Sequence, residues 1–390
     1  MSVELRPLGV RCNIQCQYCY QNPQRDAGNI PRDYNLERMK AAILEQGGEF
    51  TLFGGEALLV PKADLEDLWA WGLERNGANN VQTNGSMIDD DHITLFKKYR
   101  VSVGISIDGP GELNDVRWAG TLERTRETTA RTEAAIARLC AEGIPPSLII
   151  TLHRGNAAAD RLDRMCAWFT HLERIGIRSA RLHLLEVEDE VVRQKYALTE
   201  EENLTALLRF YALELSLRRL RFDTFKEMRD MLLGWDESTS CVWHACDPYT
   251  TRAVRGVEGD GRSSNCGRTN KDGIDFVKST EEGFERYVAL YQTPQDDGGC
   301  AGCRFFLMCK GQCPGTAVGS DWRNRTEHCG LLKRQFRIME QQHLARGILP
   351  LSLSPDRLEV EEAMIRAWLA GQNPSVASIT RNVRDSVAKG

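Results

Sequence analysis

Three cysteines near the start of the chain have the types and spacing of a reactive metal site. They are Cys12, Cys16 and Cys19, in the pattern Cys-x3-Cys-x2-Cys, and Tyr20 follows them directly. Three such thiolates can hold three irons of a four-iron, four-sulfur cube and leave the fourth iron without a protein ligand. An open coordination position distinguishes a reactive metal site from a structural one. A closed zinc site would need a fourth ligand nearby, but the first histidine is His92.

A second group of cysteines lies between residues 241 and 329. Its densest part has the spacing Cys-x2-Cys-x5-Cys-x3-Cys, from residue 300 to residue 313. Paired cysteines also bind zinc, so spacing alone leaves two zinc sites open as an alternative, although this run is unlike paired zinc knuckles. The two remaining cysteines, Cys140 and Cys166, lie singly in helical patterns. There we expect small buried hydrophobic residues.

The first half of the chain predicts the elements that must position the cysteine triplet. Short β-rich runs alternate with segments whose apolar residues recur at helical spacing. The predicted strands cover residues 3–10, 49–55, 80–85, 101–109, 146–154 and 180–188. This alternation predicts an α/β fold with a parallel sheet, in the form of a partial (β/α)6 TIM-like barrel. The triplet directly follows the first strand, at the end where such sheets carry their active sites.

Length and composition bound the domain organisation and the partners. With 390 residues the chain can form one large domain and a smaller one, and its composition becomes rich in glycine and cysteine near residue 240. We predict a barrel with linker helices at 1–236, a cysteine-rich domain at 237–340, and a helix with a tail at 341–390. The net charge of −5 and the lack of a signal peptide or a long apolar run predict a soluble cytoplasmic protein without nucleic-acid or membrane partners.

The cysteine triplet after a first strand resembles the signature of the radical S-adenosylmethionine (radical SAM) enzymes. Gly54, Gly55 and Glu56 close the second predicted strand. In that family a Gly-Gly-Glu element places its backbone against the methionine amino group of the cofactor. Such an approach suits glycine, because a residue without Cβ lets the backbone come close to a ligand. An ordinary turn between strand and helix is the alternative interpretation of these three residues alone.

Three further residues resemble cofactor contacts of the same family. Asn84 ends the third predicted strand and Ser106 ends the fourth, where the family contacts the ribose and carboxylate of the cofactor. Leu184, on the sixth strand, resembles the apolar position that packs on the adenine. Asn-Gly and Asp-Gly pairs also form turns whatever they bind, and a core leucine explains Leu184 equally well.

The resemblance implies a cofactor chemistry. A [4Fe–4S] cluster at Cys12, Cys16 and Cys19 would bind S-adenosylmethionine at its open iron and pass it one electron. The products would be methionine and a 5′-deoxyadenosyl radical, which takes a hydrogen atom from an unactivated C–H bond. The electron would come from a donor such as flavodoxin or ferredoxin.

The later cysteines resemble the C-terminal SPASM domain, which many peptide-modifying radical SAM enzymes carry. In that family eight cysteines bind two auxiliary [4Fe–4S] clusters in an interleaved way. Carried over by position, the first cluster takes Cys241, Cys246, Cys266 and Cys313, and the second takes Cys300, Cys303, Cys309 and Cys329. Full protein ligation leaves no open iron, so the resemblance implies electron transfer as their role.

These resemblances predict an enzyme that oxidatively modifies a ribosomally made precursor peptide by a cross-link at an unactivated carbon. Peptide epimerisation, or radical modification of a small molecule or protein, is the alternative, and a zinc-stabilised binding protein is a more distant one. Gly267 follows Cys266 where sulfatase-maturing members place an aspartate base, so that activity is not expected. Because the chain starts directly with the first strand, we expect a separate leader-binding protein, or none. The sequence identifies no catalytic acid or base.

Overall fold

The computed structural model describes residues 3–28, 33–187, 189–251, 254–269, 279 and 281–387. Contacts divide the chain into two compact units, the first with residues 1–223 and 255–277 and the second with residues 224–254 and 278–390. Residues 255–277, which the sequence assigns to the cysteine-rich domain, are therefore grouped with the barrel strands. The three-part division by sequence stays a prediction.

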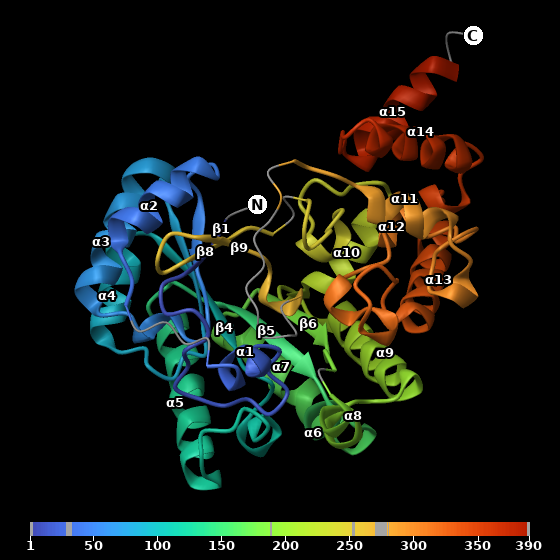
Figure 1. Ribbon diagram of the computed structural model, residues 1–390. Coiled ribbons are helices and arrows are strands. Elements are labelled where there is room, and N and C mark those ends of the chain that lie inside the picture. The colour runs from blue at the N-terminus through green and yellow to red at the C-terminus, as the bar shows by residue number, and fades with distance from the viewer. Residues whose placement is uncertain are drawn as a thin grey trace. The chain divides into compact units, whose positions relative to one another are not determined.

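The first unit is built on a nine-stranded sheet in the order β7-β6-β5-β4-β3-β2-β1-β8-β9 (Figure 1). Every adjacent pair is parallel except β8 with β9. All six predicted strands are present, and the predicted α/β fold with a parallel sheet is confirmed. The strands are β1 (Val3–Arg6), β2 (Phe50–Leu52), β3 (Asn79–Thr83), β4 (Val101–Ser106), β5 (Ser147–Leu152), β6 (Ser179–Leu184), β7 (Arg221–Phe222), β8 (Gly256–Glu258) and β9 (Ser263–Ser264).

A buried arginine ties the β8–β9 hairpin to β1. Arg6 ends β1 and is only 2% exposed. Its Nη2 lies 2.8 Å from Oε1 of Glu258, on β8, and donates to the backbone carbonyl of Asn265 at 2.7 Å. Since a buried guanidinium must be paired to be stable, this contact fixes the hairpin against the first strand.

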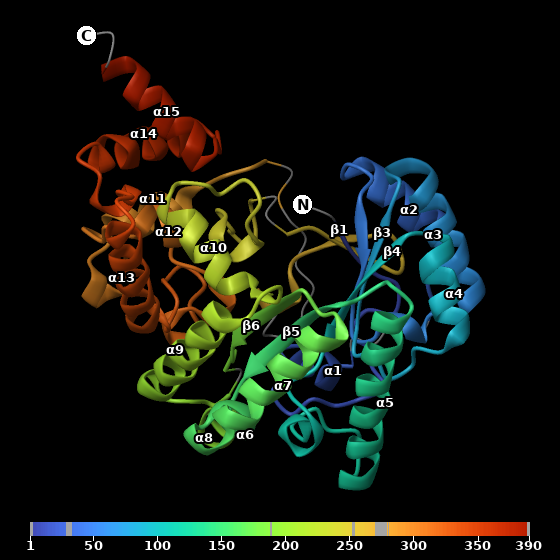
Figure 2. The ribbon, with the colours of Figure 1, turned by 180° about the vertical axis from the view of Figure 1, so that it is seen from behind.

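Helices connect the parallel strands of the first unit. In Figures 1 and 2, α2, α3 and α4 lie side by side along one face of the sheet. The core beneath them consists of fully buried strand residues such as Leu5, Leu52 and Ile105. The helices of this unit are α1 (Asn22–Asp26), α2 (Leu36–Glu45), α3 (Lys62–Asn76), α4 (Asp90–Lys98), α5 (Leu122–Ala141), α6 (Arg154–Ala157), α7 (Leu162–Ile175), α8 (Glu190–Tyr196) and α9 (Glu200–Ser216).

Helix α4 begins at a side-chain cap, which gives a testable contribution to stability. Asp89 accepts a hydrogen bond from the His92 backbone N–H at 3.0 Å and pairs with Lys62 at 2.6 Å. Partial burial opposes ionisation of Asp89, but these bonds outweigh it and lower its pKa to about 2. We expect Asp89→Ala to destabilise the protein by about 1 kcal/mol near pH 7. Urea unfolding of the variant and the wild type measures the difference.

The effect of Asp89 should depend on pH in a defined direction. Its pKa lies below the ordinary value of 3.8, so the carboxylate stabilises the folded chain above that pH, and its contribution disappears as the pH falls towards 2. Asp91→Ala is the matched control, because exposed Asp91 also pairs with Lys62, at 2.7 Å, but caps nothing. It should change the free energy of unfolding by less than about 0.5 kcal/mol. Equal effects of the two substitutions would contradict the role of the cap.

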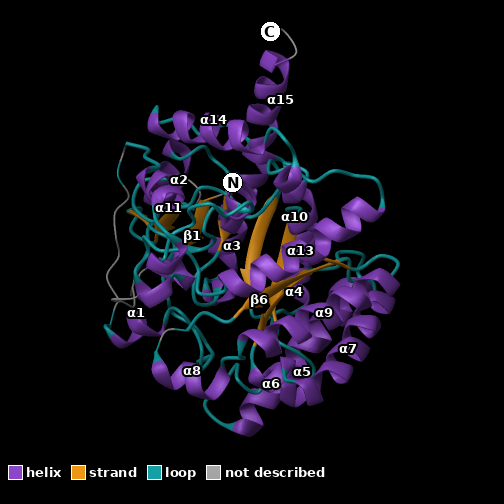
Figure 3. Cartoon of the chain, turned by 90° about the vertical axis from the view of Figure 1, so that its right-hand side faces the viewer, coloured by secondary structure: helices purple, strands orange, loops and turns teal. Residues whose placement is uncertain are grey.

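The second unit packs helices and loops around aromatic side chains, and Figure 3 shows its helices joined by loops. Trp243 and Phe305 both pack on Phe336, with ring centroids 5.8 and 5.2 Å away. No helix in the described part of the chain is long and apolar enough to cross a membrane. The helices are α10 (Asp223–Leu232), whose first residue belongs to the first unit, α11 (Glu285–Gln292), α12 (Phe306–Cys309), α13 (Cys329–Ala345), α14 (Arg357–Leu369) and α15 (Val376–Val387).

Candidate functional site

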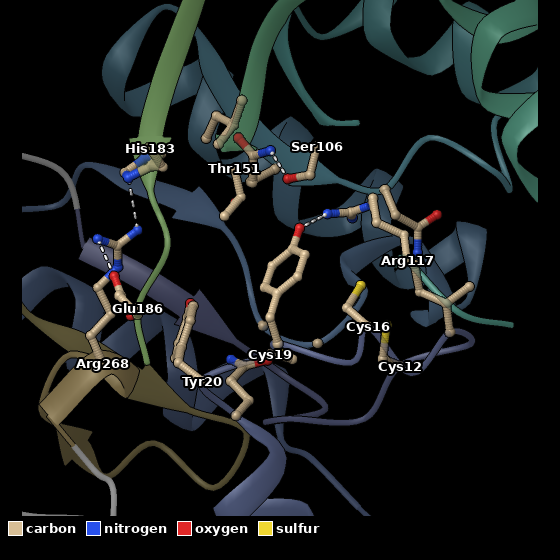
Figure 4. Close-up of a pocket in the computed structure, with 18 of the residues that line it drawn as sticks. Cys12, Cys16, Cys19, Tyr20, Ser106, Arg117, Thr151, His183, Glu186 and Arg268 are labelled. Carbon is tan, nitrogen blue, oxygen red and sulfur yellow. Dashed lines mark hydrogen bonds and ion pairs between the residues drawn. The ribbon is translucent and has the colours of Figure 1, made fainter. Parts of the chain in front are cut away.

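A cavity of about 160 Å³ lies at the C-terminal ends of the strands in the first unit (Figure 4). All three cysteines of the triplet line it, together with residues that end or follow β2, β3, β4, β5 and β6. The cavity thus brings together segments separated by more than 150 residues of sequence. Of the six predicted cofactor contacts, five line it: Gly54, Gly55, Asn84, Ser106 and Leu184.

The loop that carries the cysteines is held by backbone hydrogen bonds to another loop. Gln15 N donates to the carbonyl of Trp118 at 2.6 Å, and Gln17 N donates to that of Val116 at 3.0 Å. Cys16, between these two residues, is buried with Ile14 and Ala119, and the other two cysteines pack against this cluster. The position of Cys16 therefore depends on the segment that follows β4.

The two glycines after β2 are required by close packing against the segment before the triplet. A Cβ on Gly55 would lie 2.3 Å from the carbonyl oxygen of Arg11 and 2.4 Å from that of Val10. Gly54 has φ +128°, and its Cβ would lie 2.6 Å from the carbonyl oxygen of Gly9. The Gly55 N–H also donates to that carbonyl at 2.9 Å. The double glycine thus lets the β2 turn pair directly with the chain that leads into the cysteines.

Glu56 is buried beside the cavity rather than in its lining. Its carboxylate accepts hydrogen bonds from the Leu58 N–H at 2.9 Å, the Thr83 hydroxyl at 2.6 Å and the Asn84 N–H at 2.8 Å. Burial raises the pKa of Glu56, although these three donors partly oppose the shift. The side chain thereby fixes the end of β3. Glu56 contributes to the cavity indirectly, because it positions Thr83 and Asn84, which line it.

A chain of amide and hydroxyl groups connects the end of β3 to the cysteine loop. Asn84 Nδ2 donates to Oδ1 of Asn13 at 2.7 Å, and Asn13 Nδ2 donates to Ser86 Oγ at 3.0 Å. Ser106 accepts a hydrogen bond from Gln82 Nε2 at 2.9 Å. These contacts orient Asn84 and Ser106 at the cavity with specific partners, as a site for a polar ligand requires.

The wall on the far side from Cys12 and Cys16 is charged (Figure 4). Arg268 Nη1 lies 2.6 Å from Oε1 of Glu186, and its Nη2 lies 3.4 Å from Nδ1 of His183. Burial and the neighbouring charge of Arg268 hold the pKa of His183 well below its ordinary value, so its imidazole is neutral. The other carboxylate oxygen of Glu186, Oε2, is buried and has no hydrogen-bond partner among the described residues.

The donor set of the triplet fits an iron–sulfur cluster. Three soft thiol ligands lie on one wall of a cavity whose lining also includes both apolar and charged side chains. Burial raises the pKa of Cys12 to about 11 and that of Cys16 to about 12, so binding of iron must release their protons. Among the described residues no three His, Cys, Asp or Glu side chains converge closely enough to hold a single metal ion.

The second unit contains a cavity lined by four cysteines. Its volume is about 20 Å³, and its lining includes all four cysteines predicted for the second auxiliary cluster: Cys300, Cys303, Cys309 and Cys329. Aromatic side chains from Phe305, Phe306 and Phe336 complete much of the lining. Burial raises the pKa of Cys300 to about 12 and that of Cys309 well above its ordinary value. Four thiols in an apolar shell have the chemistry of a fully ligated cluster site.

The set predicted for the first auxiliary cluster is divided between the units. Cys241, Cys246 and Cys313 belong to the second unit, and Cys266 belongs to the first. Their joint ligation therefore stays a prediction.

The fold and the site together define a class of protein. The chain is an α/β protein with a three-cysteine site at the C-terminal ends of its parallel strands. Residues 7–165 match the Radical SAM superfamily. The chain therefore contains a radical SAM domain.

Several curated relatives are anaerobic sulfatase-maturating enzymes. The cysteine-type enzyme of Clostridium perfringens is 29% identical over 129 residues, which cover 30% of this chain and 35% of that enzyme. The serine-type enzyme of Bacteroides thetaiotaomicron is 30% identical over 131 residues, covering 29% and 30%. The serine-type enzyme of Klebsiella aerogenes is 27% identical over 210 residues, covering 50% of each chain. The chain thus spans about a third to a half of the length of these relatives.

Solved structures resemble most of the chain. The enzyme anSMEcpe with bound AdoMet and Cp18Cys peptide has a TM-score of 0.67 and 18% identity, over 88% of this chain and 98% of that one. Streptococcus suis SuiB bound to its precursor peptide SuiA has a TM-score of 0.54 and 13% identity, over 84% and 75%. At these identities the likeness shows the fold alone.

Several residues of the cavity were not identified from the sequence as parts of a site. Glu186, His183 and Arg268 have no local motif, and their meeting depends on the sheet and on the segment after β9. Arg117 follows the predicted turn after β4 in the sequence, but that pattern assigns it no role. Tyr18 could have been suspected, because it lies between two cysteines of the triplet.

Proposed function

We propose that the chain is a radical SAM enzyme that oxidatively modifies a ribosomally made peptide, forming a cross-link at an unactivated carbon. The observation that carries the proposal is that one cavity combines three thiols, a double-glycine turn and a charged far wall. When bound there, a [4Fe–4S] cluster and S-adenosylmethionine supply a radical that removes hydrogen from a C–H bond.

The residues of the first unit take defined roles in this proposal. The thiolates of Cys12, Cys16 and Cys19 hold the cluster. The backbone at Gly54 and Gly55 and the polar side chains of Asn84 and Ser106 bind the cofactor. Leu184 offers an apolar contact for the adenine, and Glu56 keeps the end of β3 in place.

The eight later cysteines are proposed to hold two auxiliary clusters that accept electrons. Removal of a hydrogen atom leaves a substrate radical, and formation of a new bond by oxidation requires the loss of one further electron. Four cysteines around one cavity in the second unit support this role for Cys300, Cys303, Cys309 and Cys329. Such clusters form where thiols stay reduced, so we propose a cytoplasmic location, with a flavodoxin or ferredoxin as electron donor.

The far wall of the cavity supports a peptide as substrate. The buried Oε2 of Glu186 has no hydrogen-bond partner among the described residues, and a buried carboxylate oxygen in that state is costly. An occupant that offers an N–H or O–H group would satisfy it, and a peptide backbone carries such donors at every residue except proline. Two structurally similar proteins, anSMEcpe and SuiB, have been solved with peptides bound. A separate leader-binding protein is a further proposed partner.

The test uses anaerobically reconstituted protein, reductant, S-adenosylmethionine and a candidate peptide encoded beside this gene. We expect about twelve iron atoms per chain, release of 5′-deoxyadenosine, and a peptide mass lower by two hydrogens. An unchanged mass after reaction in H2O, together with incorporation of solvent deuterium after reaction in D2O, would indicate epimerisation instead. Two or three zinc atoms without iron would favour a metal-stabilised binding protein and overturn the proposal.

Glu186 provides a separate prediction about substrate binding. In Glu186→Gln the side chain keeps its shape but loses the charge that pairs with Arg268 and accepts a donor from the peptide. We expect the KM for the peptide to rise about tenfold, since a hydrogen bond to a charged group contributes about 1.5–3 kcal/mol. Release of 5′-deoxyadenosine without peptide should stay at the wild-type rate.

Steady-state kinetics of product formation measures this effect. Glu190→Gln is the control, because Glu190 lies on α8 with a largely exposed side chain and should leave the KM unchanged. A wild-type KM in Glu186→Gln would show that the carboxylate does not meet the peptide.

A further inference from the structure

Three polar side chains near the cysteine loop form a hydrogen-bonded series in the first unit, and the proposed function gives this series no role. It starts at Asp108, which follows β4 and is fully buried. Oδ1 of Asp108 accepts a hydrogen bond from the Thr151 N–H at 3.0 Å, and the Asp108 N–H donates to Asn114 Oδ1 at 2.8 Å. His153 Nε2 lies 3.5 Å from Oδ2. Asp108 is therefore a fixed and paired anchor.

Tyr18 connects this anchor to the cavity. Its hydroxyl donates to Oδ2 of Asp108 at 2.5 Å and accepts a hydrogen bond from Nη1 of Arg117 at 3.2 Å. A guanidinium can only donate, and an ionised carboxylate can only accept. The direction of the series is thus fixed, from Arg117 through Tyr18 to Asp108.

The backbone brings Arg117 next to the cysteine loop. The residues before and after it, Val116 and Trp118, accept the two hydrogen bonds from the residues on either side of Cys16. Arg117 lines the same cavity as the triplet, and Figure 4 shows its side chain on the same side of the pocket as Cys16. A permanent positive charge is thereby held beside one predicted ligand of the cluster.

A fixed charge at this place has a direct electrostatic consequence. Reduction of an iron–sulfur cluster adds one negative charge, and cluster potentials depend on nearby charge, hydrogen bonds and solvent exposure. In a site of low effective dielectric a neighbouring cation stabilises the more negative, reduced state. We propose that Arg117, positioned by Tyr18 and Asp108, raises the reduction potential of the cluster held by Cys12, Cys16 and Cys19. This inference rests on the proposed presence of a cluster at the triplet.

The experiment is a redox titration of the reconstituted full chain followed by electron paramagnetic resonance. The signal of the triplet cluster is the one that changes when S-adenosylmethionine is added and that a Cys12/Cys16/Cys19→Ala variant lacks. We expect Arg117→Gln to lower the midpoint potential of the triplet cluster. A shift of 59 mV corresponds to a tenfold change in the one-electron equilibrium. Arg117→Lys keeps the charge and should therefore have a midpoint potential close to that of the wild type.

Two further variants make the result decisive. Tyr18→Phe removes the hydroxyl that holds Arg117 and should lower the potential by less than Arg117→Gln does. Arg126→Gln removes an exposed charge that pairs with Asp115, and it should leave the potential unchanged. A merely structural role of Arg117 would alter the urea midpoint and leave the potential as it is.

An unchanged potential in Arg117→Gln with full iron content would overturn the inference. If that variant binds no iron at the triplet, Tyr18→Phe decides in its place, because an unchanged potential there overturns the inference and a lower one supports it. If the wild-type chain shows no signal that responds to S-adenosylmethionine, the proposed function fails first and the inference falls with it.

Discussion

Replacing Cys12, Cys16 and Cys19 together by alanine is expected to reduce the release of 5′-deoxyadenosine to the background of the enzyme-free reaction. The three thiols line one cavity, and without them no protein ligand is left to hold the iron at which the cofactor would bind. The iron content should fall from about twelve to about eight atoms per chain, because the auxiliary sites keep their own ligands. Chromatography of the nucleoside product and iron analysis measure the two effects.

The chain offers a matched control for this substitution in its two isolated cysteines. Cys166 lies on α7 and Cys140 on α5, both away from the cavity lining. Replacing both by alanine should leave the iron content and the nucleoside release close to wild type. Equal nucleoside release from the triple variant and the wild type would remove the basis of the proposed function.

Gly55→Ala is expected to lower the rate of S-adenosylmethionine cleavage at least a hundredfold. The added Cβ would lie 2.3 and 2.4 Å from the carbonyl oxygens of Arg11 and Val10, so either the β2 turn or the segment leading into the triplet must move. A displacement of about 1 Å in a catalytic site can cost a hundredfold in rate. We also expect a loss of about 1–3 kcal/mol in the free energy of unfolding, as overpacking typically causes.

Gly77→Ala is the control for the glycine effect. Gly77 ends α3 with φ +73°, and a Cβ there would meet nothing within 4 Å. The substitution should cost about 1–2 kcal/mol through backbone strain and leave the cleavage rate unchanged. Comparing nucleoside release and urea midpoints of both variants separates strain from misplacement of the site. A wild-type rate in Gly55→Ala would show that the turn tolerates a side chain.

The local elements of the fold could be predicted because their information is local. The six predicted strands are short β-rich runs, and most of the segments between them have apolar residues at helical spacing. The position of the triplet after β1 then follows from the rule that parallel strands present their C-terminal ends on one edge. The same rule brings Gly54, Gly55, Asn84, Ser106 and Leu184 to one cavity.

The pairing of distant groups could not be predicted in the same way. Arg6 holds the β8–β9 hairpin beside β1 across about 250 residues, and no periodic pattern encodes such a contact. Glu56 is similar, because its three hydrogen bonds to Leu58, Thr83 and Asn84 depend on how β2 and β3 pair. Its buried position beside the cavity follows from packing.

The chemistry available to this protein can be predicted from its sequence, because thiol spacing and strand order are properties of the chain. The sequence placed three soft ligands at the functional edge of a parallel sheet and a second set of cysteines downstream. The surroundings of those ligands depend on how distant segments pack in the folded chain. Arg117 lines the same side of the cavity as Cys16, as Figure 4 shows, and Glu186 has one oxygen without a hydrogen-bond partner among the described residues. Both positions depend on packing between segments that are far apart in the sequence.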